Sequence, residues 1–147
     1  MKNTYFNSIF HPNIQMNDIM NHKDYKKLFR VQHRHLANII KSGTSPVLSS
    51  PSLLGFIEET CLESIMPILN NPINNRNTCV GVKSEFYHLK PSLEGDKIEC
   101  QSKLIFIEKK RKLHFKVEVY KEGTDTLIAT CDHIRYLVPE NFYKIVK

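Results

Sequence analysis

The stretch SSPSLLGFIEETCLESIMPILNNP, residues 49–72, decides the fold. A serine followed by a proline is a good helix opening, because Ser50 can accept hydrogen bonds from first-turn amides and Pro51 needs no N–H there. Apolar residues then recur at steps of three and four, which predicts a mostly buried helix. They are Leu54, Ile57, Cys61 and Ile65, with Leu53, Phe56 and Leu62 widening the stripe. Pro67 and the run 70–72 are predicted to end this helix.

Beyond an Asn-rich loop the hydrophobic period changes from about 3.6 to 2, the period of β-strands. Val80, Val82, Ser84 and Phe86 alternate with Lys83, Glu85 and Tyr87, and the same alternation marks residues 96–108, 113–120 and 126–138. An earlier strand is expected where the segment 26–40 begins, before a short helix or turn. The single strong helix must cover the apolar face of the sheet. This order predicts an α+β domain in which a curved antiparallel sheet of about five strands wraps one central helix.

Composition limits the function classes. The chain of 147 residues is 41% hydrophobic and 24% charged, which fits one globular domain and excludes a disordered chain. No apolar run is long enough to span a membrane. The net charge of +6 favours anionic partners. Four cysteines without a CxxC pair indicate reduced thiols in a cytoplasmic compartment.

The first 25 residues have few acids and no steady hydrophobic period. We expect a loosely ordered leader at 1–25 and a single domain at 26–147. Scarce acids leave organelle import open, although the leader lacks the arginines and the amphipathic run of a targeting segment.

Three segments resemble the hotdog-fold thioesterases related to fluoroacetyl-CoA thioesterase. They are residues 47–58, 78–82 and 88–95, while residues 112–115 and 132–135 resemble the family's later strands. The spacing from the helix-start hydroxyl to Glu58 matches the family pattern. So do the seven-residue steps from Gly81 to His88 and from His88 to Gly95. The similarity covers about residues 26 to 140.

The resemblance implies a hotdog homodimer that hydrolyses a small acyl-CoA, with its sites at the subunit interface and no cofactor beyond the CoA of the substrate. By position, Ser50, Glu58 and His88 supply the hydroxyl, the carboxylate and the histidine. The family usually has threonine where this chain has Ser50. The fluoroacetate-specific member has a phenylalanine gate six residues before the hydroxyl. This chain has Thr44 there, which weakens the case for a fluorinated substrate.

Thioester hydrolysis needs a nucleophile or activated water, a proton acceptor and donors for the oxyanion. Ser50 lies where first-turn amides and the helix dipole would polarise a carbonyl, unless it is only a helix cap. Glu58 lies among apolar residues, where partial desolvation would suit it to act as a base, unless it faces solvent. Eight helical residues rise about 12 Å, so Ser50 and Glu58 of one chain should meet only through substrate or across a dimer interface.

The remaining candidates lie on strands. His88 ends a strand, where it can project from the sheet rim as a proton shuttle or be an ordinary surface histidine. Gly81 can bring its amide close to the thioester oxygen or can mark a bulge. Arg135 can bind a CoA phosphate or a partner carboxylate, or be solvated.

Metal and nucleic acid are not expected. The pairs His33-x-His35 and Cys131-x-His133 lack a second pair at ligand spacing, and the basic run 109–112 has no aromatic platform beside it. Two other functions stay open: a hotdog enoyl-CoA hydratase and a non-catalytic acyl-CoA-binding module.

Overall fold

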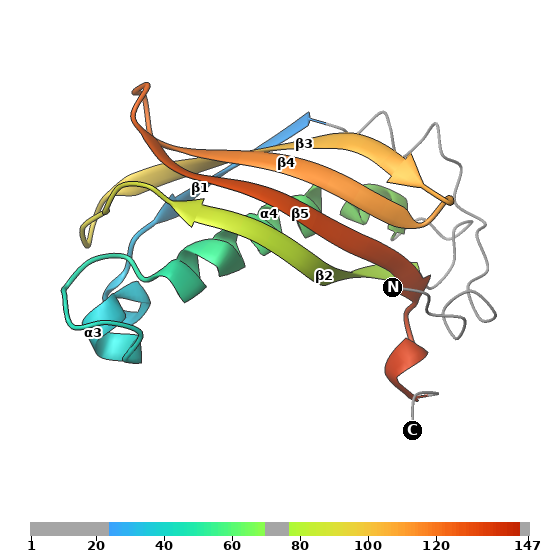
Figure 1. Ribbon diagram of the computed structural model, residues 1–147, viewed down its shortest axis with the longest axis horizontal. Coiled ribbons are helices and arrows are strands. Elements are labelled where there is room, and N and C mark those ends of the chain that lie inside the picture. The colour runs from blue at the N-terminus through green and yellow to red at the C-terminus, as the bar shows by residue number, and fades with distance from the viewer. Residues whose placement is uncertain (1–23, 70–76, 145–147) are drawn as a thin grey trace.

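The computed structural model describes residues 24–69 and 77–144, shown in Figure 1. Its main elements are β1 (Asp24–Arg30), α4 (Ser50–Leu69), β2 (Asn77–His88), β3 (Lys97–Glu108), β4 (Lys112–Lys121) and β5 (Leu127–Pro139). Three short helices join them: η1 (His33–His35), α3 (Ala37–Ile40) and η2 (Phe142–Lys144). Strand β1 begins two residues before the expected start of the domain, and residues 1–23 of the expected leader lie outside the described part.

The strands form one antiparallel sheet in the order β1-β3-β4-β5-β2. Helix α4 lies along one face of this curved sheet (Figure 1) and contacts β1, β2 and β3. Among the described strands, β1 and β2 are the two edges. The predicted α+β architecture, a curved sheet around one long helix, is confirmed.

The core lies between α4 and the sheet. Ile57, Cys61 and Ile65 are fully buried on the helix. Thr60 and Ser64 are buried beside them without leaving a hydroxyl unpaired, because Thr60 donates to the Phe56 carbonyl at 2.7 Å and Ser64 to the Cys61 carbonyl at 2.6 Å. The sheet contributes alternate residues from its inner face: Ile98, Cys100, Leu104, Leu113, Phe115, Val117, Val119, Cys131 and Leu137.

Both ends of α4 differ in detail from expectation. The cap is Ser49, whose Oγ accepts the Ser52 N–H at 3.2 Å, so the prediction that Ser50 caps the helix was wrong. Pro67 does not end the helix, which continues to Leu69. A proline in the last turn removes one helical hydrogen bond. Burial of Ile68 and Leu69, each only 5% exposed in the core, offsets that loss, so the helix continues past Pro67.

Strand β2 also departs from simple alternation. Its register with β5 passes from the Gly81–Arg135 pair directly to Lys83–Ile134, so Val82 is bulged. Val82 is 39% exposed, and the predicted alternation that groups Val80 and Val82 with Ser84 and Phe86 holds only beyond the bulge. The bulge lets Gly81 face α4 although Ser84, three residues later, faces the same side.

The four cysteines are free and buried, which agrees with the expectation of reduced thiols. Within the described ranges, no helix is long and apolar enough to cross a membrane.

Replacing Ile65 by alanine should lower the free energy of unfolding by about 2–5 kcal/mol, because the lost side chain leaves a cavity in the core. The matched control is Ile105→Ala on the outer face of β3. Ile105 is 46% exposed, so that variant should change stability by no more than about 1 kcal/mol. Urea unfolding at equal protein concentration measures both, and equal losses would contradict this description of the core.

Candidate functional site

The start of α4 meets the end of β2 at a hydroxyl–imidazole pair. The Oγ of Ser50 lies 2.9 Å from the Nδ1 of His88. Two loops are joined beside the pair, since the Leu48 N–H before the helix donates to the Ser92 carbonyl after the strand at 2.8 Å. The structure therefore brings together two of the three residues that the sequence predicts for catalysis.

The surroundings of His88 favour the neutral ring. Burial lowers the pKa of His88 below the ordinary value of 6.5, and the backbone of Lys90 offsets this only in part. In the neutral ring, Nδ1 accepts the Ser50 hydroxyl proton when Nε2 carries the hydrogen. That Nε2 is buried and has no hydrogen-bond partner among the described residues. In that tautomer the imidazole can receive a proton from Ser50, and its Nε2 hydrogen has no acceptor among the described residues.

Few amides remain at the start of α4 for an oxyanion. Pro51 has no N–H, the Ser52 amide is taken by the Ser49 cap, and the Leu53 amide bonds the Ser49 carbonyl at 3.0 Å. The sequence-based idea of several free first-turn amides is therefore wrong. The N–H of Ser50 itself is the remaining first-turn donor, together with the positive end of the helix dipole.

Glu58 lies in a second group, away from His88 of the same chain. Its side chain is exposed in the single chain, in contrast to the expected desolvation. A Cβ built on Gly81 would lie 3.4 Å from Glu58 Oε1, 3.3 Å from Arg135 Nη1 and 3.1 Å from His133 Cε1. Gly81 thus leaves the space in which the carboxylate faces the sheet.

Arg135 is 6% exposed and not solvated. Its Nε donates to Cys79 Sγ at 3.0 Å, its Nη2 to the Cys79 carbonyl at 3.1 Å, and its Nη1 lies 3.0 Å from His133 Nε2. The sequence did not lead us to expect a role for His133 or Ser84 at the site. Strand alternation carried the signal, because it places His133 and Arg135 on the same face as the buried Cys131.

The last predicted residue, Thr44, is exposed in the loop between α3 and α4. Among the described residues, no group of three or more His, Cys, Asp or Glu is arranged to hold a metal ion.

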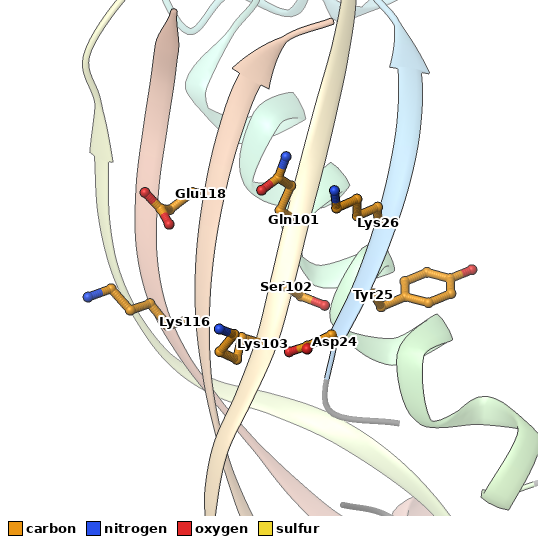
Figure 2. A pocket seen from close by; sticks show the side chains of 8 residues that line it. All are labelled: Asp24, Tyr25, Lys26, Gln101, Ser102, Lys103, Lys116 and Glu118. Atoms are coloured by element: carbon orange, nitrogen blue, oxygen red, sulfur yellow. The ribbon is translucent and has the colours of Figure 1, made fainter. Parts of the chain in front are cut away.

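One groove lies away from these residues. It has a volume of about 580 Å³ and is lined by residues of β1, β3 and β4, including Lys26, Lys103 and Glu118, with α4 behind the sheet in Figure 2. Its lining carries acids beside the lysines and includes neither Ser50 nor His88, so this groove does not coincide with the predicted catalytic residues.

Comparisons with known proteins identify the family. The model of the fluoroacetyl-CoA-specific thioesterase family matches residues 31–141. A search of curated proteins found no match.

Solved structures agree in fold. The fluoroacetyl-CoA thioesterase FlK superposes with a TM-score of 0.71 at 16% identity, covering 84% of this chain and 90% of FlK. A hot-dog-like protein from Thermanaerovibrio acidaminovorans gives 0.75 at 15% identity, covering 90% and 93%. A thioesterase superfamily member from Thermus thermophilus gives 0.71 at 19% identity, covering 83% and 85%. The chain has the hotdog fold and belongs to the fluoroacetyl-CoA-specific thioesterase family, as a thioester hydrolase.

Proposed function

We propose that this protein hydrolyses the thioester between a small acyl group and coenzyme A, as a homodimer in a reducing compartment. The Ser50–His88 hydrogen bond carries the proposal, because a hydroxyl paired with a neutral imidazole is the activated-nucleophile arrangement of acyl transfer. One variant of FlK has a solved structure in complex with fluoroacetate and CoA, and another variant in complex with acetyl-CoA. CoA enters as part of the substrate, and no separate cofactor is proposed.

The chemistry follows from the donor and acceptor roles. Ser50 Oγ attacks the thioester carbon while His88 Nδ1 takes its proton, and the ring then returns that proton to the departing CoA sulfur. Water, deprotonated by the same imidazole, releases the acid from Ser50. The N–H of Ser50 and the positive end of the α4 dipole face the developing oxyanion.

The position of Glu58 favours a site shared between subunits. Gly81, which Glu58 faces, lies seven residues before His88 on β2, a separation of about 23 Å along an extended strand. Because β2 is an edge of the described sheet, two copies can pair their β2 strands antiparallel. With the two-fold axis near Glu85, the bulge at Gly81 comes opposite His88 of the partner subunit.

In that pairing, Glu58 of one chain lies at the end of β2 that carries the partner's His88, and it reaches Nε2 once the groups that bury this nitrogen within its own chain move aside. A carboxylate there accepts the Nε2 hydrogen, holds the tautomer that receives the Ser50 proton, and stabilises the imidazolium formed during reaction. The arrangement gives the orphaned Nε2 an acceptor and assigns Glu58 an orienting role.

Replacing Ser50 or His88 by alanine should lower kcat for acetyl-CoA hydrolysis about 10²-fold or more, because the nucleophile or its proton acceptor is lost. The matched control is Ser52→Ala, a neighbouring hydroxyl on the same turn, which should stay near wild type. Release of free thiol from short acyl-CoAs measures the activity. Loss of enoyl-CoA absorbance without thiol release would instead support a hydratase, and binding without turnover a binding module.

Mixing two inactive variants should restore activity if each site takes Glu58 from one chain and His88 from the other. A dimer of one Glu58→Gln chain and one His88→Ala chain has one intact site, so a random mixture should recover about a quarter of wild-type activity. Glu59→Gln is the matched single-variant control, since Glu59 pairs with Lys27 at 3.0 Å and should keep near wild-type activity. A mixture that stays inactive after verified subunit exchange would contradict the shared site.

The acid limb of the pH profile should move when Glu58 is neutralised. His88 must be neutral to accept a proton; burial lowers its pKa below 6.5 within one chain, whereas the carboxylate of the partner's Glu58 would raise it. The midpoint of the acid limb of kcat/KM should therefore be lower in Glu58→Gln than in the wild type. Thiol release across a pH series measures both proteins, and an unchanged midpoint would contradict a Glu58 carboxylate at the partner's His88.

A further inference from the structure

A buried polar cluster stands behind Glu58 and is not used by the proposed chemistry. It consists of His133 and Arg135 on β5 and Cys79 and Ser84 on β2. His133 is 1% exposed and Arg135 is 6% exposed. Burying an imidazole and a guanidinium costs free energy unless their polar atoms are hydrogen-bonded. The hydrogen-bond partners of the two groups therefore determine which orientation and which tautomer the cluster holds.

His133 is the acceptor for Arg135. Burial and the neighbouring Arg135 lower the pKa of His133 to about 4, so the ring is neutral at physiological pH. Arginine has no acceptor, hence Nη1 of Arg135 donates to His133 Nε2 across 3.0 Å. The ring hydrogen must then be on Nδ1, where the Ser84 hydroxyl at 2.7 Å and the Lys83 carbonyl at 3.1 Å can accept it. The tautomer of His133 is fixed from both sides.

These bonds fix the guanidinium in one orientation. Cys79 holds its Nε and Nη2, and His133 holds its Nη1, which leaves one hydrogen on each terminal nitrogen free of these contacts. Among the described residues no carboxylate lies within 4.0 Å of Arg135 to form a salt bridge. The carboxylate that faces it is Glu58, with Oε1 and Nη1 at 3.4 and 3.3 Å from the same point above Gly81. Only a residue without a Cβ leaves this gap open.

We propose that Arg135, held in place by a neutral His133, is a positioning residue for Glu58: its fixed positive charge turns the exposed carboxylate toward the β2 edge. The inference rests on the proposed function, in which Glu58 must reach across that edge to the partner's His88. It assigns His133 a role through Arg135 and no contact with substrate.

Two substitutions of His133 separate positioning from packing. In His133→Gln, the side-chain oxygen reaches approximately where Nε2 was and still accepts from Arg135. In His133→Asn, the shorter amide retains only the Ser84 side of the network. We expect His133→Gln to keep kcat within about threefold of wild type and His133→Asn to lower it about tenfold or more, with KM nearly unchanged in both. Thermal melting confirms that both variants are folded, and equal kcat losses would overturn the role of His133.

Two arginine substitutions test the charge itself. Arg135→Lys keeps the charge but cannot bond Cys79 and His133 together, so kcat should fall about tenfold. The matched control is Arg111→Lys, because Arg111 is also buried, at 9% exposure, and stacks on Tyr136 away from Glu58. That variant should lose stability without losing kcat. An unchanged kcat in Arg135→Lys would overturn the proposal.

A measurement without substrate separates this inference from the proposed function. In the full-length protein at pH 7, the carboxylate ¹³C resonance of Glu58 should shift in Arg135→Lys and His133→Asn but not in Arg111→Lys. The ¹⁵N resonances of wild-type His133 should show a neutral ring protonated on Nδ1. If these signals behave as expected while no acyl-CoA is hydrolysed, the positioning stands and the thioesterase proposal fails. If Glu58 does not respond to Arg135, the positioning is wrong whatever the activity.

Discussion

One extra residue in β2 decides which groups reach the α4 face at the sheet edge. Side chains alternate between faces in a regular strand, so Gly81 and His88, seven residues apart, would otherwise face opposite sides. The bulge at Val82 absorbs one residue and lets both face the helix. Without the bulge, only one half of β2 could keep its register with β5 and its residue, Gly81 or His88, on the α4 side. The residue in the other half would face outward.

Gly81, beside the bulge, explains how a cation is buried without an ion pair to any described residue. Gly81 pairs with Arg135 in the sheet, and the missing side chain leaves room for the guanidinium. The fold satisfies that cation with a thiol, a carbonyl and a neutral imidazole, which is possible only while His133 stays uncharged. Since the pKa of His133 falls to about 4 on folding, this contribution to stability is present above pH 6.5 and is lost as the pH drops toward 4.

Sequence patterns predicted the fold well because the strongest signals, a helical stripe and period-two strands, are the ones that burial enforces. They predicted the succession of strands and helix along the chain, and the helix start to within one residue. They failed where a local competitor decided the outcome. Ser49 and Ser50 are chemically equal candidates for the cap, and only the three-dimensional position of His88 shows that Ser50 is the one left free. Composition does not reveal a bulge, so alternation alone grouped Val80 and Val82 with Ser84 and Phe86.

The sequence predicted the residues Ser50, Glu58 and His88, but not that Ser50 and His88 form one group and Glu58 another. Helical rise excluded a direct contact between Ser50 and Glu58, and in the structure Glu58 also lies away from His88 of the same chain. The separation has a chemical consequence. Within one chain, burial alone acts on His88 and lowers its pKa, whereas in the proposed dimer the partner's Glu58 would favour the protonated ring. Glu58 and His88 would then meet only where two β2 edges join. In the proposed dimer the edge strand would have two functions at once, because the pairing that covers its open hydrogen-bonding groups would also complete the catalytic group.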